Sequence, residues 1–213
     1  MKYMDLIELT RNQGWFDMAT LTQMTGERRE SLQVQLYRWR RAGKLLPLRR
    51  GMYALPEIHC VRKISPLELA NGMYAPSYLS RHWALGYYGL IPERVVEFTS
   101  TTSRAPKRFE NAFGVFSYRH VKQTAFFGYR VMTINGACVF LAEPEKALLD
   151  LWYLEKGDWT MERMAAMRFQ EFDRVNAEKL MNYAAAFQST KVLAAARTWS
   201  ALLNEKPEEG REI

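Results

Sequence analysis

The sequence predicts an α+β protein, with an N-terminal winged helix-turn-helix followed by an α+β domain that has a small antiparallel sheet and a helical C-terminus. Three observations predict this fold. Amphipathic helix patterns fill most of the first 42 residues, an arginine-rich hairpin pattern follows them, and later strand patterns are flanked by helices. We expect the winged domain to cover 1–56, a connector 57–65, the second domain 66–205 and a frayed tail 206–213.

The charge of the chain is unevenly distributed. The net charge of +7 divides into +4 for residues 1–60, +6 for 61–130 and −3 for 131–213. A basic front half suggests an acidic partner such as nucleic acid, although charge alone does not identify one. No run approaches the roughly 18 apolar residues that cross a membrane, and the first residues lack the apolar core of a signal peptide. We therefore expect a cytoplasmic protein with no membrane partner.

Two short helices are expected at the start of the chain. The first covers 5–11, and the two aromatic residues that follow Gly14 are expected to fill the corner after it. Asp17 is a suitable N-cap for the second helix, which covers 18–24 and ends at Gly26.

A longer, basic helix is expected over 28–42, with Gly43 at its C-terminal end. Leu32, Leu36 and Trp39 fall on one narrow stripe that would pack on the first two helices. Arginine, glutamine and an exposed tyrosine suit a helix in a DNA major groove, whereas a solvated helix face is the plain alternative. The face opposite the apolar stripe carries Glu30, Gln33, Val34, Tyr37, Arg38 and Arg41.

The segment 45–55 has two short apolar runs around Arg49, Arg50 and Gly51, which is the pattern of a β-hairpin. A hairpin after a recognition helix is a wing, and arginines at its tip would reach phosphate or the minor groove. About five neutralised phosphates would give a log–log salt slope of about −4 to −5. The candidate DNA-binding residues are Arg28, Arg29, Ser31, Gln33, Tyr37, Arg38, Arg41, Lys44, Arg49 and Arg50, of which Ser31, Gln33 and Tyr37 are candidates for base edges.

The second domain is expected to begin with a helix at Pro66, capped by Ser65, and a second helix from Ser80 to Gly89. Strands are expected over 95–99 and 115–119, followed by a hairpin around Asn135-Gly136. Helices follow over 145–154, 161–167, 177–187 and 191–204. The basic loop with Arg104, Lys107 and Arg108 either extends the DNA contact or is a solvated turn.

Nothing in the sequence predicts an enzyme, a cofactor or a metal site. The three histidines are far apart, and neither a nucleophile elbow nor a P-loop pattern occurs. Glu143, Glu145 and Asp150 could be imagined as a carboxylate cluster, but acidic residues at a helix start are also favoured by the helix dipole.

Several motifs in order resemble the AbiEi antitoxin family. They are the strings 87–93 (YYGLIPE), 99–102, 113–118 and 142–150, together with Arg50-Gly51-Met52-Tyr53 at the end of the N-terminal domain. The resemblance covers about residues 1–155 and implies an antitoxin encoded beside a nucleotidyltransferase-like toxin, with which it need not form a stable complex. It further implies repression of its own operon through a winged helix, and by position it places DNA contacts at Arg38, Arg41, Arg49 and Arg50. The toxin's Gly-Ser signature is absent.

The leading hypothesis is thus an antitoxin and autorepressor that binds inverted repeats in double-stranded promoter DNA. One alternative is a regulator whose second domain binds a small effector in an aromatic pocket, and a less favoured one is a metal-dependent nuclease that uses the three carboxylates named above. The aromatic residues considered for an effector pocket are Tyr87, Tyr88, Phe113, Phe116, Phe126 and Phe127.

Overall fold

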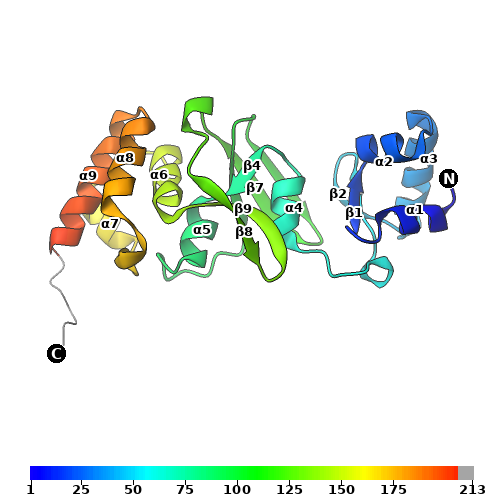
Figure 1. Ribbon diagram of the computed structural model, residues 1–213, viewed down its shortest axis with the longest axis horizontal. Helices are drawn as coiled ribbons and strands as arrows, with labels where there is room; N and C mark the ends of the chain where they lie inside the picture. Colours follow the sequence, from blue (N-terminus) through cyan, green and yellow to red (C-terminus); the bar gives the residue numbers. More distant parts are fainter. Residues whose placement is uncertain (206–213) are drawn as a thin grey trace.

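The structure is a computed structural model that describes residues 1–205, and these residues form an α+β protein. The chain is elongated, with the N-terminus at one end, a six-stranded sheet in the middle and the last three helices at the other end (Figure 1). The frayed tail expected over 206–213 lies outside the described residues. Within residues 1–205 no helix has both the length and the apolarity that a membrane crossing requires.

The N-terminal module, residues 1–55, contains three helices and a three-stranded antiparallel sheet in the order β1-β3-β2. The three expected helices and the expected hairpin are present. The corner expected after Gly14 is instead strand β1, because its backbone pairs with the second hairpin strand, Trp15 opposite Ala54. The elements are α1 (Tyr3–Thr10), β1 (Trp15–Asp17), α2 (Met18–Thr25), α3 (Arg29–Arg41), β2 (Leu46–Arg49) and β3 (Met52–Ala54).

Local signals explain where α2 begins and ends. The carboxylate of Asp17 accepts a hydrogen bond from the backbone N–H of Thr20 at 2.7 Å, as an N-cap does. Gly26 ends the helix with a φ of +66°, a left-handed conformation that glycine adopts without strain. Asp17 and Gly26 thus set the two ends of α2, and α3 begins three residues after Gly26.

The C-terminal body, residues 66–205, is built on a six-stranded sheet in the order β6-β7-β5-β4-β9-β8. The small antiparallel sheet expected here is a larger, mixed one, since β5 pairs with β7 and β4 with β9 in parallel. Helix α4 covers one face, and α5 and α6 cover the other (Figure 1). The elements are α4 (Pro66–Gly72), β4 (Ser77–Leu79), α5 (Arg81–Tyr87), β5 (Phe98–Thr102), β6 (Lys107–Asn111), β7 (Gly114–His120), β8 (Tyr129–Ile134) and β9 (Ala137–Ala142).

Four further helices complete the body. Helix α6 (Pro144–Leu154) is buried along most of its length, because α8 and α9 pack on its outer side. Trp152 of α6 and Trp199 of α9 are fully buried, with ring centroids 5.9 Å apart. The other helices are α7 (Met161–Ala166), α8 (Ala177–Ala186) and α9 (Thr190–Glu205), and short 3₁₀ turns occur at Glu57–His59, Gln123–Ala125 and Phe172–Arg174.

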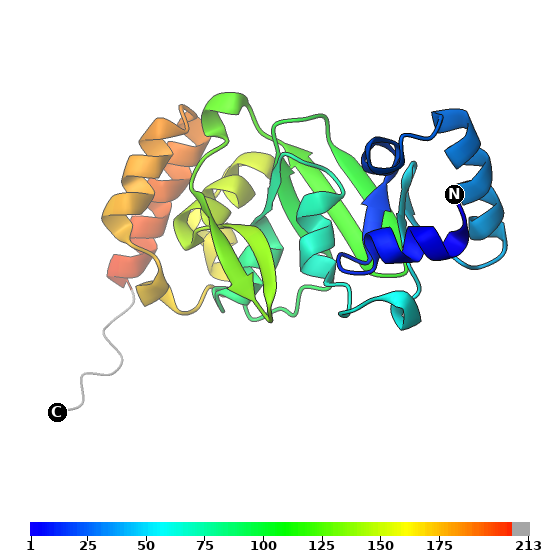
Figure 2. The same ribbon diagram turned by 45° about the vertical axis from the view of Figure 1, so that its right-hand side comes forward.

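The sheet of the N-terminal module is covered on both faces. Phe16 and Leu55 pack with the three helices of the module, whereas Leu48, Met52 and Ala54 belong to the core of the C-terminal body. Figure 2 shows this small sheet between the module's helices and the body. The hairpin therefore joins the module to the body along one face and is not a free projection.

Candidate nucleic-acid interface

Helix α3 presents two different faces. Leu32 and Leu36 are fully buried in the core of the N-terminal module, and Trp39 packs against that core. On the opposite side Val34 is 50% exposed and Tyr37 is 54% exposed. Exposing such large apolar side chains to water is unfavourable, so they indicate a surface that a partner covers. The helix lies at the end of the molecule, away from the C-terminal body (Figure 1). Its outer face is therefore open to a large partner.

The basic side chains of α3 and its flanks have no acidic partners. All are exposed, and none forms an ion pair with any side chain of residues 1–205. Because the only exposed acid on the helix is Glu30, their positive charges add to one another over a short surface. This set, the basic surface, comprises Arg28, Arg29, Arg38, Arg40, Arg41 and Lys44.

A hollow of about 500 Å³ lies along the outer face of α3 and reaches Tyr53 of β3. The α3 residues that line it are Glu30, Gln33, Val34, Tyr37 and Arg40. The Arg40 guanidinium lies 5.6 Å from the centre of the Tyr37 ring. Sequence reasoning missed Arg40 and Tyr53. Arg40 could have been predicted, because it lies three residues after Tyr37 and therefore on the same side of the helix. Tyr53 could not, because only the folded hairpin places it next to α3.

The three residues predicted to read bases do not behave alike. Gln33 and Tyr37 lie in the hollow, and neither side chain is hydrogen-bonded to another described residue. Ser31 does not line the hollow, and its hydroxyl accepts a hydrogen bond from Gln35 Nε2 at 3.2 Å. Gln35 also donates to Glu27 at 3.1 Å. Ser31 is thus part of a local hydrogen-bond network on the flank of the helix.

The end of α3 is anchored to α1. The Tyr3 hydroxyl donates to the carbonyl of Lys44 at 2.8 Å, and the Lys44 ammonium lies 5.0 Å from the centre of the Tyr3 ring. The Tyr3 ring also packs on Trp39, with centroids 5.4 Å apart. Lys44 therefore remains exposed while its backbone is fixed.

The two hairpin arginines, both predicted to contact DNA, lie in different environments. Arg49 is half-buried, and its Nε donates to the carbonyl of Met73 in the C-terminal body at 2.6 Å. The neighbouring turn is also held, because the carbonyl of Gly51 accepts from the N–H of Met18 at 2.8 Å. Arg50 is exposed. Because the body covers the second face of the small sheet, Arg49 contributes to the junction between module and body, and its guanidinium is less available to DNA than that of Arg50.

The basic loop expected to extend the DNA contact belongs to the C-terminal body. Arg104 donates to the carbonyl of Ala75 at 3.0 Å and lies 4.6 Å from the centre of the Tyr74 ring. Lys107 and Arg108 are exposed at the start of β6. The other end of that strand contacts the module, where Asn111 donates to the carbonyl of Leu48. Lys107 is four residues before Asn111, which corresponds to a distance of about 13 Å along the strand. These residues do not continue the basic surface.

The carboxylates considered for a nuclease each have structural partners. Glu143 accepts from Tyr183 at 2.7 Å and pairs with Lys179 at 2.8 Å, while Glu145 accepts from the N–H of Asn176 at 2.9 Å. Asp150 is fully buried and pairs with Lys146. Among residues 1–205 no group of three or more histidine, cysteine or acidic side chains is arranged to hold a metal ion.

The aromatic residues considered for an effector pocket do not share one. Phe116 and Tyr88 are buried in the main core, and Phe126 packs on Tyr78 with ring centroids 5.1 Å apart. Phe113 lines a different hollow, next to Pro66. Core packing accounts for Tyr88 and Phe116, whereas Tyr87 is 41% exposed.

Comparison with known proteins gives little guidance. No family model matches the chain, and no curated protein matches it. Among solved structures, it is similar to the crystal structure of RV2827C protein from Mycobacterium tuberculosis, with 14% sequence identity and a TM-score of 0.41. The match covers 95% of this chain and 81% of that chain. The likeness is too distant to carry a function to this protein.

Proposed function

We propose that the N-terminal module is a winged helix-turn-helix that binds double-stranded DNA through the outer face of α3. The single observation that supports this most is the basic surface, whose side chains are exposed and unpaired within the described residues. A surface with six basic side chains, one exposed acid on the helix and no ion pairs among them suits a polyanion, whereas a solvated helix face is usually balanced by residues of the opposite sign. The order of helices and strands in the module also favours this assignment.

In this proposal most basic residues bind phosphates. Arg38 and Arg41 lie in the last turn of α3, Lys44 lies three residues after its end, and Arg50 lies in the hairpin turn. Such contacts position the protein without reading sequence. Gln33 and Tyr37 are the candidates for base edges, since both line the hollow and a glutamine amide can bind adenine in the major groove.

The wider function we propose is that of a cytoplasmic antitoxin that represses its own operon. The supporting observation is the order of motifs shared with the AbiEi family, from 87–93 to 142–150, which lie in the C-terminal body. Its toxin would be a nucleotidyltransferase-like protein encoded next to it. Repression needs only occupancy of promoter DNA, so no catalytic step is assigned to this chain.

DNA binding is tested with a labelled duplex from the region upstream of the reading frame, by fluorescence anisotropy at several salt concentrations. We expect Arg38→Ala/Arg41→Ala to weaken Kd at least about tenfold and to make the log–log salt slope about 2 units shallower. Arg174→Ala/Arg197→Ala also removes two exposed positive charges, one in the turn where Arg174 pairs with Glu171 and one in α9, and is the control. Equal Kd values for the two double variants would contradict the assignment of α3.

The antitoxin proposal is tested by co-expressing the chain with the product of the adjacent reading frame and measuring growth. We expect the wild-type chain and Arg38→Ala/Arg41→Ala to protect equally, because the variant alters only the DNA-binding surface. If the wild-type chain does not relieve a growth defect that the neighbour causes alone, the antitoxin proposal fails while DNA binding is untouched.

A further inference from the structure

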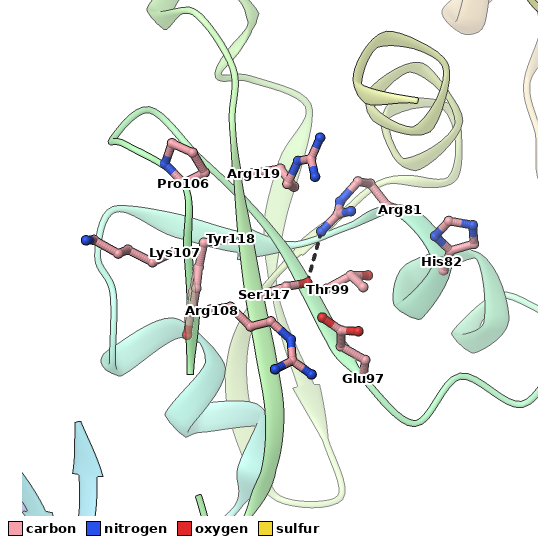
Figure 3. A pocket seen from close by; sticks show the side chains of 10 residues that line it. All are labelled: Arg81, His82, Glu97, Thr99, Pro106, Lys107, Arg108, Ser117, Tyr118 and Arg119. Atoms are coloured by element: carbon pink, nitrogen blue, oxygen red, sulfur yellow. Dashed lines mark hydrogen bonds between the residues drawn. The ribbon is translucent and has the colours of Figure 1, made fainter. Parts of the chain in front are cut away.

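A pocket of about 440 Å³ lies in the C-terminal body, far from α3, on the sheet face that α5 partly covers (Figure 3). Its volume is within the range of small-molecule sites. Arginines reach it from three different elements: Arg81 from the start of α5, Arg108 from β6 and Arg119 from β7. Like-charged groups repel one another, so their convergence from separate elements needs an explanation.

Strand register shows why these side chains share one face. Arg108 is opposite Ser117, which in turn is opposite Thr99, so the three residues form one row across β6, β7 and β5. Arg119 lies two residues further along β7 and therefore on the same side. Tyr118, between them, points to the other face, where its hydroxyl donates to the carbonyl of Ala70 in α4 at 2.7 Å.

Arg81 is the unusual member of the group. It is only 7% exposed, and its φ of +56° is a conformation that non-glycine residues seldom adopt. Its Nη2 donates to the Ser100 carbonyl and the Ser117 hydroxyl, both at 3.4 Å, and its Nε has no partner among residues 1–205. Burial lowers the pKa of Arg81 to about 10. A buried guanidinium with an unused donor and no ion pair in the described chain is costly unless something else binds it.

We propose that this pocket binds the phosphate group of a small molecule, with Arg81 at its floor and Arg108 and Arg119 at its rim. The planar fork of a guanidinium matches two phosphate oxygens, so each of these arginines is a suitable donor to a phosphate group in the pocket. Glu97 lines the pocket, and Glu110 pairs with Arg108 at the rim at 3.4 Å, so the three arginines leave an excess of one positive charge, which suits an anion. Lys107 is opposite Tyr118, so its side chain belongs to the other face of the sheet.

His82 also lines the pocket, and burial lowers its pKa below the ordinary value. Near pH 7 it is therefore neutral and can donate or accept one hydrogen bond. Together with the Ser117 hydroxyl it provides neutral polar groups beside the arginines. Both groups can donate hydrogen bonds to phosphate oxygens.

The recessed position of Arg81 favours a terminal phosphate over the backbone of a duplex. A diester phosphate on the convex surface of DNA would meet the rim arginines but would not reach a side chain that is 7% exposed. The pocket residues Arg108 and Ser117 lie on one face of the sheet, whereas the other face contacts α4 through Tyr118 and the N-terminal module through Asn111. The inference thus goes beyond the proposed DNA binding and is independent of it.

The test is isothermal titration calorimetry of the full chain in chloride buffer with inorganic phosphate, pyrophosphate and phosphoserine, and with succinate as a dicarboxylate. We expect one phosphate ligand per chain. Arg108→Gln and Arg119→Gln should each weaken its Kd about tenfold or more, as expected for the loss of one charged hydrogen bond. Arg94→Gln removes an exposed charge that does not line the pocket and should leave Kd unchanged.

The relative affinities identify the source of the phosphate: a free ion, a diphosphate or a monoester. The rim variants keep the test valid even if Arg81→Gln does not fold. The proposal is overturned if none of the three phosphates shows saturable binding, if succinate binds more tightly than all of them, or if the rim variants bind like the wild type. Promoter DNA affinity should be the same for Arg119→Gln and the wild type, and a loss there without phosphate binding would assign the pocket to DNA instead.

Discussion

Lys146 lies in the core of the C-terminal body, and none of its side chain is exposed. Its ammonium donates to Asp150 at 2.5 Å and to the carbonyl of Ala125 at 2.8 Å, and it lies 4.2 Å from the centre of the Phe187 ring. Burial lowers the pKa of Lys146, against the opposing effect of the Asp150 charge. Asp150 in turn accepts from the Ser80 hydroxyl at 2.7 Å, one residue before Arg81. This network joins α6 to the start of α5.

We predict that Lys146→Met lowers the free energy of unfolding by about 3–5 kcal/mol, because it leaves the Asp150 carboxylate buried without its ion-pair partner. The double variant Lys146→Met/Asp150→Leu removes both charges and should be more stable than the single variant. Urea unfolding of the three proteins measures this. A double variant less stable than Lys146→Met would show that the pair itself, and not the unpaired charge, determines stability.

The second prediction concerns Glu143 and the stability of the fold at low pH. Burial alone would raise the pKa of Glu143, but hydrogen bonds from Lys179 and Tyr183 and the charge of Lys179 outweigh it, so the pKa is lowered. A lowered carboxyl pKa stabilises the fold above the ordinary value, near 4.5, and that contribution is lost as pH falls through the lower folded value. Wild type should therefore be more stable than Glu143→Gln at pH 7, and the difference should shrink below pH 4.5. A difference independent of pH, measured by urea midpoints, would argue against this coupling.

At the scale of elements, the hairpin of β2 and β3 carries neighbouring arginines with different roles. Arg49 donates to the Met73 carbonyl across the junction, whereas Arg50 is exposed. We predict that Arg49→Ala lowers the free energy of unfolding by about 1–3 kcal/mol and leaves DNA affinity unchanged. Arg50→Ala should instead leave stability within about 0.5 kcal/mol and weaken DNA binding.

The two single variants are controls for each other, because each removes one arginine from the same turn. Thermal unfolding and anisotropy on the promoter duplex measure both properties. If Arg49→Ala weakened DNA binding and left stability unchanged, the hairpin would act as the projecting wing that the sequence alone predicts.

Elements specified by nearby residues were predictable, and elements specified by distant ones were not. The third helix follows from its apolar stripe, and α2 from Asp17 and Gly26. Strand β4 has only three residues, and β6 is mostly polar because it lies at the sheet edge, so neither gives a strong pattern. The parallel pairing of β4 with β9 joins residues some sixty positions apart, and no local pattern determines it.

The candidate sites follow the same rule. The face of α3 was predictable because a helix places residues three and four apart side by side. The role of Arg49 was not, since it depends on a carbonyl 24 residues away. The arginine pocket was missed for the same reason, because Arg81, Arg108 and Arg119 are brought together only by strand pairing and by the turn into α5. An isolated arginine after a serine gives no signal in the sequence.

At the scale of the whole molecule, the N-terminal module is fixed to the body partly by Trp15, which packs against α4. A Cβ added at Gly72 would lie 2.5 Å from Trp15 Cη2 and 2.8 Å from Cζ2, closer than two carbon atoms can approach. The absence of a side chain at Gly72 is therefore what allows β1 to sit on α4. This contact complements the Arg49 hydrogen bond on the same junction.

We predict that Gly72→Ala lowers the free energy of unfolding by about 1–3 kcal/mol, since the Trp15 ring must move out of its packed position. Alanine normally stabilises a helix by up to about 1 kcal/mol relative to glycine. A lower free energy of unfolding would therefore indicate the clash with Trp15, and a higher one would indicate helix propensity. Gly86→Ala in α5 is the matched control, because its added Cβ would meet Val95 at an ordinary 3.4 Å. Trp15→Phe should relieve the effect of Gly72→Ala in a double-mutant cycle measured by urea unfolding. If Gly72→Ala and Gly86→Ala were equally stable, Trp15 would not hold the module against the body, and the orientation of α3 relative to the sheet would depend on the hairpin alone.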